Sequence, residues 1–290
     1  MAISKYLKRL ENLKGKEIIV TGGTSGIGLN IVDHLLYKEA DVIVLARNVD
    51  KAKEVKTKFE NKYPNCHLDF IFYNQNDLAS IDHAINQIIE HHSSFYAMIF
   101  NAGVLCSKKC YEGLSVTMKT NFIGTAYFIK NLLPHLKGEH RIIMQGSLVA
   151  GFKDIDIKSL EDKTSPLKQY TISKCGVEAL YYHYSNIYKG DITFYLVEPG
   201  LTSSDIIRHF SAPIRMMGKA FLKIFAQSTK KAALPAIYAL QSNVKPSFIV
   251  PRSPLASRGY PKIKEFPKNR QREHLLSLVD PYIEKEAVIN

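Results

Sequence analysis

The chain has 290 residues, a formal net charge of +12 and a hydrophobic fraction of 46%, which excludes a disordered or collagen-like protein and describes a globular one. No stretch offers about 18 uninterrupted apolar residues, so no membrane span is predicted. The surplus of lysine and arginine fits nucleic acid, an anionic membrane surface or an anionic small ligand. Since no nucleic-acid-binding motif accompanies it, lysines spread over a solvated surface are the favoured interpretation.

The first strand and the turn after it form a candidate nucleotide-binding turn. The predicted strand Glu17–Thr21 holds a β-branched run typical of a strand buried on both faces. Gly22, Gly26 and Gly28 follow at once, and later apolar residues recur at helical spacing. Glycines let a pyrophosphate approach the backbone, and a helix N-terminus attracts its charge. A glycine pattern alone also marks an ordinary tight bend.

The second predicted strand, Asp41–Ala46, ends directly before Arg47. Dinucleotide folds that prefer the unphosphorylated cofactor usually place an acidic side chain near this point, where it binds the ribose hydroxyls. A guanidinium suits a 2′-phosphate instead, through a bidentate charge-assisted contact. The alternative is an exposed arginine that starts the next helix, predicted at about Asp50–Lys62.

Two further strands are predicted at His67–Tyr73 and Phe95–Phe100. Asp77 follows the first of them and opens an amphipathic helix, so it either caps that helix or faces an adenine. Asn101 and Gly103 follow the second, where small residues permit a close ligand approach. Four alternations of strand and helix predict a parallel sheet wound on both faces by helices.

A long helix is predicted over Ser115–Leu136, with Asn121 in its middle. Asparagine is a poor mid-helix residue unless its amide has a function or faces water. The fifth predicted strand, Arg141–Gln145, leads to Ser147.

The next helix begins near Pro166 and carries Tyr170 and Lys174. These two residues are four positions apart, so they lie one above the other on the same side of the helix. The sixth predicted strand, Ile192–Val197, is followed by Glu198, Pro199 and Gly200.

The remainder of the chain is expected to add a lid and an extension. Residues 201–227 are basic and apolar, which predicts a substrate lid; a membrane-surface segment is the less favoured alternative. A helix near Thr229–Leu240, a strand near Ser247–Pro251 and a helix near Lys268–Lys285 complete the pattern. We therefore expect one domain over residues 1–290, with about seven strands and a C-terminal extension over 252–290.

The four cysteines fall at spacings that match no zinc site, so no metal is predicted; they are Cys66, Cys106, Cys110 and Cys175. They are interpreted as reduced intracellular thiols, and the polar N-terminal stretch lacks the apolar core of a secretion signal. A cytoplasmic location is therefore expected.

The candidate residues at the strand ends and on the intervening helices belong at the carboxyl edge of the sheet, where such folds bind ligands. In this combination, from about Gly15 to Leu240, the chain resembles the classical short-chain dehydrogenase/reductase family. The motifs that carry the resemblance are Thr21-Gly22 with Gly26-Ile27-Gly28, Asn101-Ala102-Gly103, Asn121, Ser147, Tyr170 with Lys174, and Pro199-Gly200. It looks most like the retinol-dehydrogenase-like, NADP-preferring members, because of Arg47, the 23 positions from Ser147 to Tyr170, and the tail Phe248–Arg252.

The resemblance implies a Rossmann-type fold and hydride transfer between NADP(H), favoured over NAD(H), and a carbonyl or hydroxyl group of a small to medium apolar substrate. Tyr170 would be the general acid and base. Lys174 would lower the pKa of that phenol, which is otherwise about 10, and hold the nicotinamide ribose. Ser147 would polarise the substrate oxygen, and Asn121 would hold a water that links Lys174 to solvent.

The resemblance also implies a set of cofactor contacts. Gly22, Ser25, Gly26, Ile27 and Gly28 would border the phosphates, Arg47 the 2′-phosphate, Asp77 the adenine, Asn101 and Gly103 the adenosine ribose, with Tyr170, Lys174, Pro199 and Gly200 near the nicotinamide half. Ser204 and Asp205 fall near the expected carboxamide. Gly146 and Glu198 depart from the family's usual residues, and Glu198 is expected to alter the charge near the nicotinamide end.

Two other functional classes fit parts of the pattern. A dinucleotide-binding sensor or scaffold would keep the fold without catalysis, although it has no need of the complete Asn, Ser, Tyr and Lys set. A sugar-nucleotide epimerase or dehydratase also uses Tyr and Lys, but such proteins usually have two residues between the first glycines, where Gly22 and Gly26 enclose three. The expected partners are the small-molecule substrate and a second copy of the chain, since the family is commonly dimeric or tetrameric.

Overall fold

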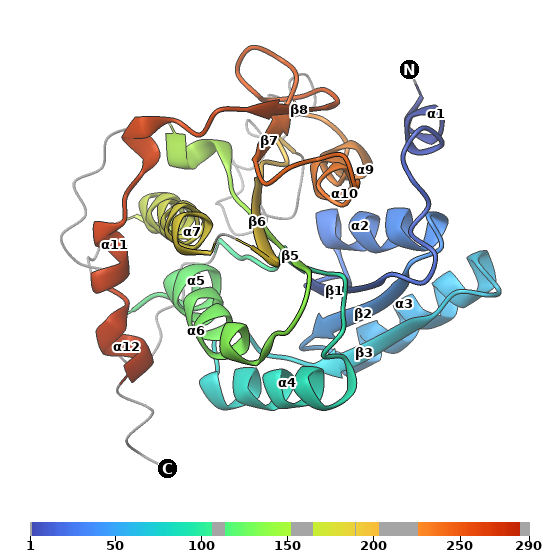
Figure 1. Cartoon of the computed structure of the whole chain (residues 1–290), viewed down its shortest axis with the longest axis horizontal. Helices are drawn as coiled ribbons and strands as arrows, with labels where there is room; N and C mark the ends of the chain where they lie inside the picture. Colours follow the sequence, from blue (N-terminus) through green and yellow to red (C-terminus); the bar gives the residue numbers. More distant parts are fainter. Residues whose placement is uncertain (1, 106–113, 152–164, 189, 203–225, 285–290) are drawn as a thin grey trace.

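The computed structural model describes residues 2–105, 114–151, 165–188, 190–202 and 226–284. Within them, one sheet of eight strands has the order β3-β2-β1-β4-β5-β6-β7-β8 (Figure 1). The strands are β1 (Glu17–Thr21), β2 (Asp41–Ala46), β3 (Leu68–Phe72), β4 (Ala97–Phe100), β5 (His140–Gln145), β6 (Ile192–Val197), β7 (Phe248–Pro251) and β8 (Pro261–Lys264). All neighbours are parallel except β7 and β8. The predicted doubly wound parallel sheet is confirmed.

Helices cover both faces of the sheet because its central strands are apolar on both sides. In β1, Ile18 and Val20 face one core and Ile19 faces the other. The first core includes α1 (Ile3–Leu7), α2 (Gly26–Tyr37), α3 (Val49–Lys62) and α10 (Leu234–Tyr238), which follows the short α9 (Thr229–Ala232). The second includes α4 (Leu78–His91), α6 (Gly124–Leu132) and α7 (Pro166–Ile187). Among the described residues, no helix combines the length and the apolar character needed to cross a lipid bilayer.

The eighth strand was not predicted from the sequence. β8 begins with a proline and places Lys264 at the exposed outer edge of the sheet, beside the half-exposed Ile263. Such a short, lysine-bearing strand is typical of a protected sheet edge and lacks the apolar run that marks the buried strands.

The helix expected over Ser115–Leu136 is interrupted. It consists of α5 (Val116–Met118), a π-helical turn η1 (Lys119–Ile123), α6 and the 3₁₀ turn η2 (Leu133–His135). The π turn contains Asn121, whose side chain is bonded to other parts of the chain rather than facing water. An inserted π turn of this kind is frequent at functional sites.

The helix expected near Lys268–Lys285 is also divided, into η5 (Lys268–Arg270), α11 (His274–Ser277) and α12 (Asp280–Glu284). Arg270 and Arg272 are buried at the first break, and Pro281 enters the first turn of α12. Leu275 on α11 is fully buried, and α11 lies against α7 (Figure 1). Of the predicted lid at 201–227, residues 203–225 lie outside the described residues; Thr202 and Gln227 form a parallel bridge.

Gly176 lets α7 approach the π turn closely. A Cβ on Gly176 would lie 2.4 Å from two ring atoms of Phe122, which is fully buried. This contact joins the helix of Tyr170 to the turn that contains Asn121, so a missing methyl group fixes the spacing of two site elements.

We expect Gly176→Ala to lower the free energy of unfolding by about 1–2 kcal/mol, because overpacking against Phe122 outweighs the roughly 1 kcal/mol that alanine gains in a helix. Urea unfolding measures the change. Gly190→Ala is the matched control, since a Cβ there meets nothing within 4 Å, and it should stay within about 0.5 kcal/mol of the native chain. A Gly176→Ala variant as stable as the native chain would contradict the packing argument.

Candidate active site

A cavity of about 350 Å³ opens at the carboxyl edge of the sheet. Its wall includes most of the candidate residues from the sequence analysis: Gly22, Ser25, Gly26, Ile27, Gly28, Arg47, Asn101, Gly103, Ser147, Tyr170, Lys174, Pro199 and Gly200. Asp77 and Asn121 do not line it, and Ser204 and Asp205 lie outside the described residues. The fold therefore brings the glycine turn and the Tyr170–Lys174 pair to one cavity.

The turn between β1 and α2 leaves an open cradle of backbone groups. Gly22 has a φ of 70°, a conformation that favours glycine. A Cβ on Gly28 would lie 2.2 Å from the carbonyl oxygen of Gly22, so the turn closes only without that atom. Ser25 occupies the N-cap of α2, but its side chain makes no capping bond. The first N–H groups of α2 are thus available to an anion, and the helix dipole favours one.

A chain of hydrogen bonds joins this turn to the catalytic candidates across three neighbouring strand ends. Thr21 Oγ1 accepts the N–H groups of Asn101 and Ala102 at 3.1 and 2.9 Å. Asn101 Nδ2 donates to the Thr21 carbonyl at 2.9 Å, and Gln145 Nε2 donates to Asn101 Oδ1 at 3.0 Å. Lys174 Nζ then donates to the Gln145 carbonyl at 2.8 Å. These hydrogen bonds fix the directions of the Thr21, Asn101 and Lys174 side chains.

Lys174 is buried, with 5% of its surface exposed. Loss of water disfavours the ammonium and lowers the pKa of Lys174 to about 8, while the Glu178 carboxylate one helical turn further on opposes this change. The group therefore holds its charge at neutral pH against a desolvation cost.

Tyr170 is buried beside Ser147. Burial raises the pKa of Tyr170, because the phenolate is the charged form, and a side-chain hydrogen bond with Ser147 lowers it. Lys174 Nζ lies 6.0 Å from the centre of the Tyr170 ring. In this arrangement Ser147, rather than Lys174, opposes the effect of burial on the phenol.

Asn121 holds neighbouring elements together. Its Oδ1 accepts the N–H of Val104 at 2.8 Å, and its Nδ2 donates to the Val104 carbonyl at 2.9 Å and to Ser173 Oγ at 3.0 Å. A Cβ on Gly103 would lie 3.4 Å from Asn121 Oδ1 and 3.5 Å from Lys174 Nζ. Asn121 and Lys174 therefore border the same small space beside Gly103.

Arg47 and Asp77 differ in what they face. Arg47 is exposed on the cavity wall, and no hydrogen bond or ion pair with the described residues occupies its guanidinium. Asp77 caps α4, where its carboxylate accepts the N–H of Ser80 at 3.5 Å. The capping alternative thus describes Asp77 in this structure.

Glu198 turns away from the cavity. It is 1% exposed, and its carboxylate accepts a hydrogen bond of 2.6 Å from Arg270. The expected change of charge near the nicotinamide end is therefore offset by a guanidinium that the sequence analysis did not connect to it.

Sequence reasoning missed several residues of the wall. They include Tyr73, Asn74 and Gln75 after β3, Thr120 in the π turn and Gln145 at the end of β5. Four of these five directly end or follow a strand, so the rule that ligands bind at the carboxyl ends of parallel strands would have found them.

A family model described as "short chain dehydrogenase" matches residues 16–214. A polyprenol dehydrogenase of Homo sapiens is 25% identical over 234 residues, which cover 76% of this chain and 71% of that protein.

Two solved structures have a similar fold. An uncharacterised protein from Mycobacterium paratuberculosis has a TM-score of 0.72 at 17% identity, covering 96% of both chains. A short-chain dehydrogenase from Burkholderia cenocepacia J2315, solved in complex with NADP, has a TM-score of 0.66 at 19% identity, covering 82% of this chain and 96% of that one.

We expect Lys174 to make stability depend on pH. Its pKa falls from 10.5 in the unfolded chain to about 8, so between these values the unfolded state binds more protons and stability rises with pH. From pH 7 to pH 9.5 the free energy of unfolding should gain about 2 kcal/mol relative to Lys174→Met. Urea unfolding of both proteins at each pH measures this.

The control is Lys264→Met, at the exposed sheet edge, whose difference from the native chain should not change over the same interval. An equally constant difference for Lys174→Met would show that the ammonium is not desolvated on folding.

Proposed function

The chain belongs to the short-chain dehydrogenase family and is an NAD(P)-dependent oxidoreductase, and we propose that it transfers a hydride between NADP(H) and the carbonyl or hydroxyl group of a small to medium apolar substrate. The observation that carries this proposal is that Tyr170 and Lys174 line the same cavity as the glycine turn. Ser147 completes the set, since it lines the cavity and is hydrogen-bonded to Tyr170.

The wall of the cavity suits a phosphorylated dinucleotide. The turn from Gly22 to Gly28 has no side-chain cap and would hold the pyrophosphate. Arg47, exposed and unpaired with the described residues, would bind the 2′-phosphate. Asn101, Gly103, Pro199 and Gly200 would border the rest, and Asp77 would support the adenine pocket from its place at the N-cap of α4. When bound, the nicotinamide supplies or accepts the hydride.

The chain's own residues would handle the proton. Tyr170 would donate it to the carbonyl oxygen in reduction and take it from the hydroxyl in oxidation. Ser147 would donate a hydrogen bond to the substrate oxygen, which polarises the carbonyl and stabilises the negative charge that develops on that oxygen. The Lys174 ammonium would hold the nicotinamide ribose. A water in the space beside Gly103 would contact Asn121 and Lys174 and restore the proton from solvent.

An apolar substrate is supported by the similarity to a polyprenol dehydrogenase and by the apolar residues of the predicted lid, which lie outside the described residues. Membership of the retinol-dehydrogenase-like subgroup and a homo-oligomeric state remain part of the proposal. A cytoplasmic location also belongs to it, and the free thiols of Cys66 and Cys175 suit a reducing compartment.

We expect Tyr170→Phe to lower kcat for carbonyl reduction by about 10² to 10⁴, the contribution of a positioned acid, with NADPH affinity almost unchanged because the ring remains. NADPH absorbance and fluorescence titration measure the two quantities. Tyr181→Phe, a buried tyrosine on the same helix that does not line the cavity, is the control. Native turnover in Tyr170→Phe would remove the assignment of Tyr170 as the general acid and base. If the native protein binds NADPH but no aldehyde or ketone leads to its oxidation, a sensor is favoured.

We expect Arg47→Asp to reduce the preference for NADPH over NADH by at least about tenfold, equivalent to about 1.4 kcal/mol, because a carboxylate would replace the guanidinium at the 2′-phosphate. The ratio of the two dissociation constants is the measurement. Lys51→Asp changes the same charge on the first turns of α3 at a residue that does not line the cavity, and it should leave most of the preference. An unchanged ratio in Arg47→Asp would refute the contact.

A further inference from the structure

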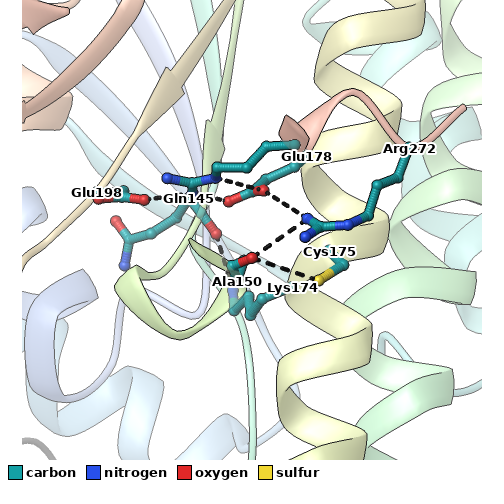
Figure 2. A network of polar contacts seen from close by, with 8 residues as sticks. Gln145, Ala150, Lys174, Cys175, Glu178, Glu198 and Arg272 are labelled. Atoms are coloured by element: carbon teal, nitrogen blue, oxygen red, sulfur yellow. Dashed lines mark hydrogen bonds and ion pairs between the residues drawn. The ribbon is translucent and has the colours of Figure 1, made fainter. Parts of the chain in front are cut away.

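Two buried carboxylates, Glu178 and Glu198, belong to a polar network with Lys174 of the cavity wall (Figure 2). The proposed reaction does not use them. Glu178 is fully buried on α7, four residues after Lys174, and Glu198 is 1% exposed directly before Pro199. A buried carboxylate is costly unless a cation and hydrogen bonds compensate it. Both carboxylates come from elements that carry residues of the cavity wall.

Arg270 supplies the compensating cation to both. Its Nε donates to Glu178 Oε2 at 2.9 Å and its Nη2 donates to Glu178 Oε1, which makes a two-bond fork. The same Nη2 donates to Glu198 Oε1 at 2.6 Å. The guanidinium is centred 5.2 Å from the ring centre of Phe248, so an aromatic face shields it from water. One side chain of the C-terminal segment thus joins α7 to the end of β6.

Arg272 extends the connection to a third part of the wall. Its Nη1 donates to the carbonyl of Ala150 at 3.3 Å and lies 3.7 Å from Glu178 Oε2. Ala150 belongs to η3 (Leu148–Gly151), which directly follows Ser147. The two arginines therefore contact or adjoin the segments that present Tyr170 with Lys174, Ser147, and Pro199 with Gly200.

We propose that Arg270 is a positioning residue for hydride transfer: through Glu178 and Glu198 it sets the place of α7 relative to the Pro199-Gly200 turn, and it favours the ionised form of Glu178, one helical turn from Lys174. The proposal rests on the proposed function and assigns the C-terminal segment, which contributes no residue to the described cavity wall, a role in the geometry of that wall.

The electrostatic part follows from the groups that face each other in the network. Burial raises the pKa of Glu178 to about 7. Arg270 lowers this pKa most strongly and Arg272 lowers it further, whereas the nearby Glu198 carboxylate raises it. Glu178 in turn is the charged group that supports the Lys174 ammonium; the Gln145 carbonyl from β5 contacts the same ammonium as a neutral acceptor. Without Arg270, Glu178 would take up a proton and this support would be lost.

The test uses the full chain in several variants. Arg270→Met alone leaves two carboxylates without their cation and is expected to fold poorly. The triple variant Arg270→Met, Glu178→Gln and Glu198→Gln also removes the two carboxylates. It leaves no carboxylate buried without its cation and is therefore expected to fold. Arg270→Lys keeps the charge but loses the fork. Arg258→Met, an exposed arginine of the same C-terminal extension, is the control.

The first readout is kinetic. In the triple variant we expect kcat for carbonyl reduction to fall at least about tenfold, while the NADPH dissociation constant stays within about threefold, because the phosphate half of the cavity is untouched. Arg270→Lys should also lose kcat. Arg258→Met should behave as the native chain. A folded triple variant with native kcat would overturn the positioning role.

The second readout needs no turnover. Lys174→Met is introduced into the native chain and into the triple variant. For each of the two pairs, with and without this substitution, the difference in unfolding free energy is measured against pH, and the pH interval over which it changes is compared. Loss of the Glu178 charge should move that interval downward by about one pH unit in the triple variant, whereas Arg270→Lys should keep it. An unmoved interval would overturn the electrostatic role.

The two readouts separate this proposal from the proposed function. If no carbonyl compound supports NADPH oxidation by the native protein while the pH interval still moves in the triple variant, the proposed function fails and the link from Arg270 to Lys174 stands. If the native protein is active and neither kcat nor the interval responds in the triple variant, the inference fails alone.

Discussion

The structure depends on an ammonium group that has lost most of its contact with water. Lys174 is buried on α7, and its charge is kept by the Gln145 carbonyl at the end of β5 and by Glu178 one turn further along the helix. The first contact ties the lysine to the hydrogen bonds that run through Asn101 to Thr21 and the glycine turn. The second ties it to Arg270 and the C-terminal segment. The glycine turn and the C-terminal segment are therefore both coupled to one desolvated charge.

Much of the fold could be predicted because its physical causes are local. The buried strands contain β-branched and apolar runs, and the glycine turn, the proline at the start of α7 and the period of α4 mark where elements begin. The failures have the opposite origin. β8 exists because its lysine-bearing chain pairs with β7, and the π turn is accompanied by bonds from Asn121 to Val104 and Ser173. Such contacts join residues distant in sequence, so no window of sequence contains them.

In the candidate site, too, some features could be predicted from the sequence and others could not. Residues at strand ends, such as Gly22, Asn101 and Ser147, could be placed on one edge of the sheet from topology alone, and they line one cavity. The direction of a side chain could not be predicted in this way. Glu198 precedes two residues of the wall, yet it turns toward Arg270, 72 positions further along the chain. The pairing was invisible because the segment with Arg270 was expected to be a continuous helix.

The ion network also has a temporal side, because a ribosome makes the chain from its N-terminus. Glu178 and Glu198 are synthesised 92 and 72 residues before the arginine that neutralises them. During synthesis both carboxylates are without this cation until Arg270 has been added, and an unpaired carboxylate is far less costly in water than in a buried position. A polypeptide interrupted before Arg270 would therefore carry two unneutralised carboxylates on the segments that present Lys174 and Pro199.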